Sequence, residues 1–160
     1  MTTTLQMFER VKRAWQPIAA PPATDMTAME WGWGEEAAVA FTEVKPTDVD
    51  IDSPGFRAAT PLFDLPNSAA AAYLGTYLLS LLKQLDFQEK VGLPTDFTTR
   101  AHTLTCLTDT DFWDDVIRAH LPKPCLEAVT EVARLLVEKR ELLALEQDEV
   151  ETLIAMAGPR

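Results

Sequence analysis

A long apolar run in the middle of the chain predicts its central helix. Every residue from 69 to 82 is apolar, Gly, Thr or Ser, and the first charge after the run is Lys83. Asn67 and Ser68 stand just before the run, and both are residue types that favour helix N-caps. A helix that is apolar on all sides must be buried on all sides. The pattern therefore predicts a buried helix over residues 68–85, with the rest of the chain packed around it.

Two amphipathic segments are predicted near the ends of the chain. Residues 3–15 place apolar side chains on one face at three- and four-residue spacing, and Pro17 would end this helix. The apolar positions of residues 124–157 also keep mostly to three- and four-residue steps. This second tract is either one helix or a hairpin that breaks near residues 146–148, and Gly158 follows its last turn.

The segments between the first and the central helix are less regular. Residues 24–41 suggest a second helix, in which Thr27 and Glu30 have capping-box spacing and Asp25 is the alternative cap. Gly32 and Gly34 make two shorter elements as plausible as one helix, because each glycine costs a helix about 1 kcal/mol relative to alanine. Residues 42–67 hold four of the eleven prolines and are acidic. Within them, residues 49–52 alternate apolar and acidic side chains, which suits a short exposed strand.

A threonine-rich segment follows the central helix. Residues 95–108 contain six threonines, a composition that favours a strand, and a helix capped by Thr95 or Asp96 is the alternative. Phe112 and Trp113 lie near the start of the next predicted helix and are expected in the core. That helix is predicted to open at one of three capping residues: Thr108, Asp109 or Thr110.

Together these patterns predict a mainly α fold. A chain of 160 residues suits one domain. We expect residues 1–160 to form a single compact domain of about five or six helices around the buried central helix, with a minor β element as its only strand content. Residues 42–67 are expected to be its least regular part.

The charge of the chain is strongly negative and unevenly distributed. The formal net charge is −11, and residues 16–67 carry nine acidic and two basic side chains, a net of −7. Residues 1–15, in contrast, carry three basic and one acidic side chain, a net of +2. A surface of this sign repels nucleic-acid phosphates and anionic membranes and attracts basic proteins. The simpler interpretation is that the acidity keeps the protein soluble.

The cysteine content and the hydropathy indicate a cytoplasmic protein. Two cysteines, Cys106 and Cys125, are too few for a disulfide framework and are expected to be buried, reduced thiols. The N-terminal residues lack the apolar core of a secretory signal. The apolar run of the central helix is 14 residues long, shorter than the roughly 20 that span a bilayer.

Tests for catalytic and metal-binding motifs give no candidate. His102 and Cys106 stand four residues apart, a spacing that can place two ligands on one helix face, but nothing nearby completes a zinc set. Asp48, Asp50 and Asp52 occupy the first, third and fifth positions of a calcium loop, but its required Gly and Glu are replaced by a Ser and an Ala. No phosphate-binding loop or nucleophile elbow is present. We therefore predict no catalytic residue, metal or cofactor.

A partner-binding surface is the remaining candidate. Trp31 and Trp33 flank one glycine, so they cannot both face the core of a regular helix, and an exposed tryptophan often anchors a partner. The alternative is that both pack against the central helix through an irregular turn. The acidic residues nearby would meet a basic surface. The candidate partner-binding residues are Trp31, Trp33, Glu35, Glu36, Asp48, Asp50 and Asp52.

The central segment resembles an uncharacterised family of small bacterial domains of unknown function. In that family a Leu-x-Pro turn leads into a helix with the pattern Tyr-Tyr-Leu-Pro-x-Tyr-Leu. The matching residues here are Leu62, Phe63, Leu65 and Pro66, followed by Tyr73, Leu74, Tyr77, Leu78 and Leu79. This chain departs from the pattern at Ala72, where a second Tyr is usual, and at Gly75, where Pro is usual. The family has no established activity, so the resemblance implies no catalytic residue.

Three functional hypotheses follow from these observations. The first is a non-enzymatic acidic binding module that masks a basic partner surface, as immunity proteins and inhibitors do. The second is a homo-oligomeric structural or regulatory protein that associates through spare apolar faces of its first or last helices. The third is a small enzyme that uses carboxylates with Tyr73 or Tyr77 in a pocket.

Overall fold

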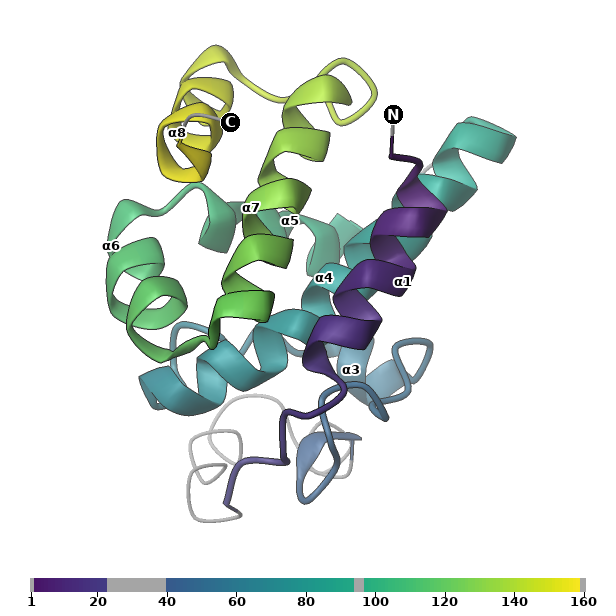
Figure 1. The fold of residues 1–160 in the computed structure, drawn as a ribbon. Helices are drawn as coiled ribbons and strands as arrows, with labels where there is room; N and C mark the ends of the chain where they lie inside the picture. Colours follow the sequence, from purple (N-terminus) through teal and green to yellow (C-terminus); the bar gives the residue numbers. More distant parts are fainter. Residues whose placement is uncertain (1, 23–39, 94–96, 159–160) are drawn as a thin grey trace.

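The computed structural model of the chain describes residues 2–22, 40–93 and 97–158, and every structural statement concerns these residues. They contain helices and turns and no strand, so the mainly α, single-domain prediction is confirmed and the minor β element is not seen in them. Figure 1 shows the arrangement. The helices are α1 (Thr4–Trp15), α3 (Pro54–Ala58), α4 (Asn67–Val91), α5 (Phe97–Leu107), α6 (Thr110–Phe112), the π-helix η2 (Trp113–Arg118), α7 (Lys123–Glu138) and α8 (Gln147–Ala157).

Helix α4 is the buried central helix that the apolar run predicts. From residue 69 to residue 85 every side chain except Lys83 is buried. The predicted caps are wrong, because Pro66 takes the N-cap position without a side-chain hydrogen bond, and Asn67 and Ser68 lie inside the first turn. Pro66 already has an extended backbone, with ψ at 145°, and its carbonyl accepts from Ala70 N at 2.9 Å. The proline ring fixes φ for the turn into the helix.

Helix α1 lies along α4 and α7 (Figure 1). Thr3 caps it and forms a capping box with Gln6, neither of which was predicted. Trp15 at its other end is fully buried and donates from Nε1 to the carbonyl oxygen of Ala72 at 3.0 Å. Gly75 lies under this indole, and a Cβ there would come within 2.3 Å of the ring. The close contact of α1 with α4 therefore depends on the absence of a side chain at Gly75.

The strand predicted for the threonine-rich segment is wrong, since this segment forms α5. The hydroxyl of Thr103 donates to the carbonyl of Thr99 four residues earlier at 2.7 Å, and Thr105 and Thr108 make the same kind of bond. These bonds satisfy the hydroxyls within the helix. Thr99 and Thr103 are buried, and α5 packs on α4. Packing of this face on the central helix overrides the β-propensity of threonine. The alternative caps of α5, Thr95 and Asp96, lie outside the described residues.

The strand predicted for residues 49–52 is also wrong, because this segment forms turns. The alternation nevertheless indicates which side chains face inward. Val49 is buried, Ile51 is half-buried, and Asp50 and Asp52 are exposed. A period of two therefore describes the burial of this loop without describing its backbone.

The C-terminal third contains the predicted helix opening and a hairpin. Asp109 caps α6, its Oδ1 accepting from Phe112 N at 2.8 Å, and both Phe112 and Trp113 are buried as predicted. Of the two arrangements open for residues 124–157, the structure has the hairpin, since α7 ends at Glu138 and α8 begins at Gln147. Guanidinium groups of Arg118 and Arg134 donate to the last carbonyls of α8 and hold it in place.

No helix in the described ranges combines the length and the hydropathy that a bilayer crossing requires.

Candidate functional site

The structure describes three of the seven candidate partner-binding residues. Asp48, Asp50 and Asp52 lie in the loop between residue 41 and α3. The other four candidates, namely Trp31, Trp33, Glu35 and Glu36, lie outside the described residues. The candidate site is therefore the acidic loop, residues 41–59, together with the face of α4 that holds it.

Asp48 and Asp50 point to solvent, and the backbone of the acidic loop is fixed by bonds of its own. The Oδ1 atom of Asp50 accepts a hydrogen bond from Asp52 N at 3.0 Å, which closes an Asx turn. The side chain of Ser53 accepts from Phe56 N at 3.3 Å and caps α3. Buried Val49, between the two aspartates, anchors the loop from below. The two carboxylates are therefore presented by an ordered turn.

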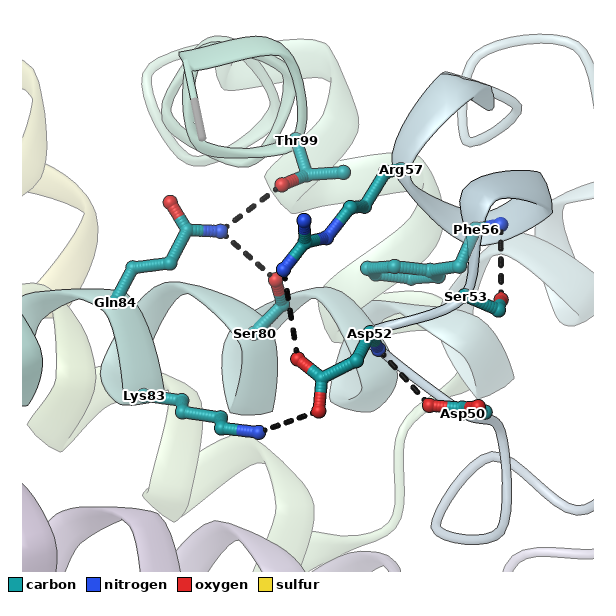
Figure 2. A network of polar contacts seen from close by, with 9 residues as sticks. All are labelled: Asp50, Asp52, Ser53, Phe56, Arg57, Ser80, Lys83, Gln84 and Thr99. Atoms are coloured by element: carbon teal, nitrogen blue, oxygen red, sulfur yellow. Dashed lines mark hydrogen bonds and ion pairs between the residues drawn. The ribbon is translucent and has the colours of Figure 1, made fainter. Parts of the chain in front are cut away.

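Asp52 ties the acidic loop to the central helix. Its carboxylate lies 2.7 Å from Lys83 Nζ of α4 and 3.6 Å from Arg57 of α3, as Figure 2 shows. The hydrogen bond from Lys83 lowers the pKa of Asp52, against the opposing effect of its partial burial. The Asp52 side chain is 57% exposed, so these ion pairs add little to global stability. Asp52 is thus already neutralised within the chain, whereas Asp48 and Asp50 remain available to a partner.

Three hydroxyl groups of α4 hold the loop from its buried side. Tyr73 donates to the carbonyl oxygens of Phe41 at 2.6 Å and Val44 at 3.0 Å. Thr76 donates to the carbonyl of Pro46 at 2.7 Å, and Tyr77 donates to that of Ala59 at 2.8 Å. Each bond satisfies a backbone carbonyl that would otherwise accept a hydrogen bond from water. This role was not predicted, although hydroxyl residues at three- and four-residue spacing on an otherwise apolar helix indicate such a face.

Tyr73→Phe tests whether these bonds set the order of the acidic loop. The change removes one hydroxyl that serves two carbonyls, and we expect a loss of about 1–2 kcal/mol in the free energy of unfolding. Amide hydrogen exchange should accelerate in residues 44–52 more than in α7. Equal exchange in both regions would contradict a local role for this hydroxyl.

An aromatic cluster underlies the same region. Phe41, Phe56, Tyr73 and Tyr77 pack with ring centroids 4.7–6.3 Å apart. His102 of α5 meets Tyr77 edge-on at 5.3 Å, and its Nε2 atom accepts from Leu62 N at 3.2 Å. Burial lowers the pKa of His102 to about 4, only partly opposed by the charge of Asp64. The imidazole is therefore neutral at neutral pH and acts as a buried acceptor.

A polar network crosses from α4 to α5 beside the loop (Figure 2). Gln84 Nε2 donates to Ser80 Oγ at 3.0 Å and to Thr99 Oγ1 at 3.1 Å. One turn further on, Arg100 donates to Gln88 Oε1, and Gln88 donates to the carbonyl of Leu142 at 2.9 Å. These bonds lock α4, α5 and the segment before α8 together, so the face of α4 that holds the loop is itself rigid.

The thiols of Cys106 and Cys125 and the side chain of Tyr73 are buried. Burial raises the pKa of Cys106 well above its usual range and that of Cys125 to about 11, so both thiols stay protonated. Burial also raises the pKa of Tyr73 to about 12, and its hydroxyl is bound to two carbonyls. No three His, Cys, Asp or Glu side chains of the described ranges come together as metal ligands.

Comparison of this chain with protein-family models, with curated proteins and with solved structures found no match. The resemblance to the family of small bacterial domains therefore stays a prediction.

Proposed function

We propose that the protein is a non-enzymatic, cytoplasmic binding module that uses its acidic loop to cover a basic surface of a partner protein. One observation carries this proposal: an anchored turn presents the carboxylates of Asp48 and Asp50 to solvent. The carboxylate of Asp52 is paired with Lys83 and Arg57 and holds that turn. The net charge of −7 over residues 16–67 also favours a positively charged partner.

Anchoring matters because a binding loop loses conformational entropy when it docks. Here the hydroxyls of Tyr73, Thr76 and Tyr77 and the ion pairs of Asp52 order the loop before any encounter. A preordered loop forfeits less free energy on binding than a mobile one. Exposed carboxylates on such a loop also accelerate the encounter with a cationic surface at low salt.

The experiment begins with recovery of the partner. The tagged protein is used to capture proteins from its source lysate at low and high salt, and those captured are identified by mass spectrometry. The association rate of the purified partner is then measured by interferometry with Asp48→Asn/Asp50→Asn. We expect this variant to associate several-fold more slowly at low salt, with a weaker salt dependence.

A matched variant separates the loop from the general acidity of the chain. Glu141→Gln/Glu151→Gln removes the same charge at exposed positions near and within α8. We expect it to change the association rate much less than the loop variant does, because its charges lie outside the docking surface. Equal slowing by both variants, or a partner without a basic surface, would overturn the proposed function.

A further inference from the structure

A groove lies between the end of α1 and the start of α7, and the acidic loop contributes nothing to it. It has a volume of about 450 Å³. Figure 1 shows the two helices side by side, and the thiol of Cys125 donates to the carbonyl of Ala14 at 3.2 Å, which joins their ends. The groove is lined by Arg10, Arg13, Ala14, Pro17, Ile18, Pro122, Pro124 and Glu127.

The groove carries positive charge on a strongly negative protein. Arg10 and Arg13 stand three residues apart on α1, which places both guanidinium groups on one side of the helix. Both side chains are exposed, and no carboxylate in the described ranges forms an ion pair with either. Glu127, the one acidic residue among those lining the groove, lies 3.9 Å from Lys123. The uncapped N-terminus of α7 adds partial positive charge.

The remaining lining is apolar. Ala14, Pro17 and Ile18 come from the end of α1 and the turn after it, and Pro122 and Pro124 come from the start of α7. The prolines present rigid apolar surface without donor N–H groups. The same two arginines also line a second hollow along α1, with Thr2, Leu5, Gln6 and Glu9, and its one apolar residue, Leu5, is exposed. The guanidinium groups of Arg10 and Arg13 therefore have apolar surface beside them in the groove.

We propose that this groove binds an acidic segment of a partner protein. Two carboxylates of the segment pair with Arg10 and Arg13, and a neighbouring apolar side chain packs on the proline-lined floor. Guanidinium groups suit this role because their planar donors form bidentate bonds with carboxylates. The net charge of −11 disfavours a polyanion, and the groove lining offers no aromatic face on which a base can stack, so a peptide fits better than a nucleic acid.

The test selects ligands without assuming their sequence. A displayed library of random peptides of about twelve residues is panned against the whole protein, and enriched peptides are synthesised with a fluorophore for anisotropy titrations. We expect the enriched peptides to share two or more Asp or Glu residues beside an apolar residue. Arg10→Gln and Arg13→Gln should each weaken their binding by about tenfold, and the double variant by more.

Lys12→Gln is the matched control, because it removes one charge from the same helix at an exposed residue that lines neither hollow. It should change the affinity by less than about twofold. The thermal unfolding of all these variants should match that of the unchanged protein, since the substituted side chains are exposed. Asp48→Asn/Asp50→Asn should leave the acidic peptides bound, which separates this proposal from the acidic loop.

Three outcomes would overturn the proposal. The first is a library without enrichment of acidic peptides. The second is an enriched acidic peptide whose affinity does not change when Arg10 and Arg13 are replaced. The third is binding of a single-stranded oligonucleotide, or of vesicles containing phosphatidylserine, that is lost in the arginine variants while no acidic peptide is selected. That result would assign the same arginines to phosphate recognition.

Discussion

Gly75→Ala is expected to lower the free energy of unfolding by about 2–3 kcal/mol, although alanine is the better helix former. An alanine Cβ at this position would lie 2.3–2.4 Å from three atoms of the Trp15 indole. Trp15 is fully buried and is held by its bond to the carbonyl of Ala72, so the ring cannot move aside at low cost. Overpacking of this kind costs more than the roughly 1 kcal/mol that a glycine-to-alanine change gains in a helix.

Chemical denaturation of the purified variant measures this effect. A second variant keeps the prediction testable, because Trp15→Leu removes the clashing ring and carries its own cost. If the two side chains collide, the double variant Trp15→Leu/Gly75→Ala should be more stable than the sum of the two single losses indicates. Additive losses, or a Gly75→Ala protein as stable as the unchanged one, would show that the α1–α4 contact tolerates a Cβ.

Gly75 also illustrates what a sequence pattern conveys. The absence of charge from residue 69 to residue 82 correctly predicts that α4 is buried, because burial is a property of the segment itself. The need for glycine at this position depends on Trp15, which lies 60 positions earlier. No local pattern records that pairing, so the sequence predicts the burial of the helix but not its closest contact.

The same distinction explains the errors in the secondary structure. The β-propensity of threonine favours a strand at residues 97–107, where packing on α4 makes a helix. Asn67 and Ser68 are good cap residues, but the turn at Pro66 moves the start of the helix ahead of them. The free energies of intrinsic propensity are small compared with those of tertiary packing. A segment with weak periodicity therefore adopts the secondary structure that packs best against its neighbours.

The candidate site is likewise only partly visible in the sequence. The alternation of acidic and apolar residues correctly predicts that Asp50 and Asp52 are exposed. The groups that hold the loop were not predicted, because Tyr73 and Thr76 bind backbone carbonyls about 30 positions away. Every residue carries the same backbone carbonyl, so the sequence does not show which of them accepts a hydrogen bond. The charges of such a surface are therefore easier to predict from a sequence than the hydrogen bonds that hold its loop in place.

Acidification is expected to destabilise the protein before its carboxylates titrate, because of His102. Burial lowers the pKa of this side chain from 6.5 to about 4 in the folded chain. Above pH 6.5 the imidazole is neutral in both states and contributes no pH dependence. Between the two values the unfolded chain binds the proton and the folded chain does not, so stability falls as the pH falls. The loss is about 1.4 kcal/mol per pH unit, or about 2 kcal/mol between about pH 7.5 and pH 5.

His102→Gln isolates this effect, because glutamine retains an acceptor for Leu62 N but does not titrate. Chemical denaturation of both proteins is measured at about pH 7.5 and pH 5. The quantity compared is the change in the free energy of unfolding of each protein between the two pH values. We expect the difference to shrink to a few tenths of a kcal/mol in His102→Gln. It should persist in His120→Gln, whose side chain is exposed. The lowered pKa of Asp52 acts only at lower pH, since stability from a carboxylate is lost below its ordinary value of 3.8. An unchanged difference in His102→Gln would place the acid sensitivity elsewhere in the chain.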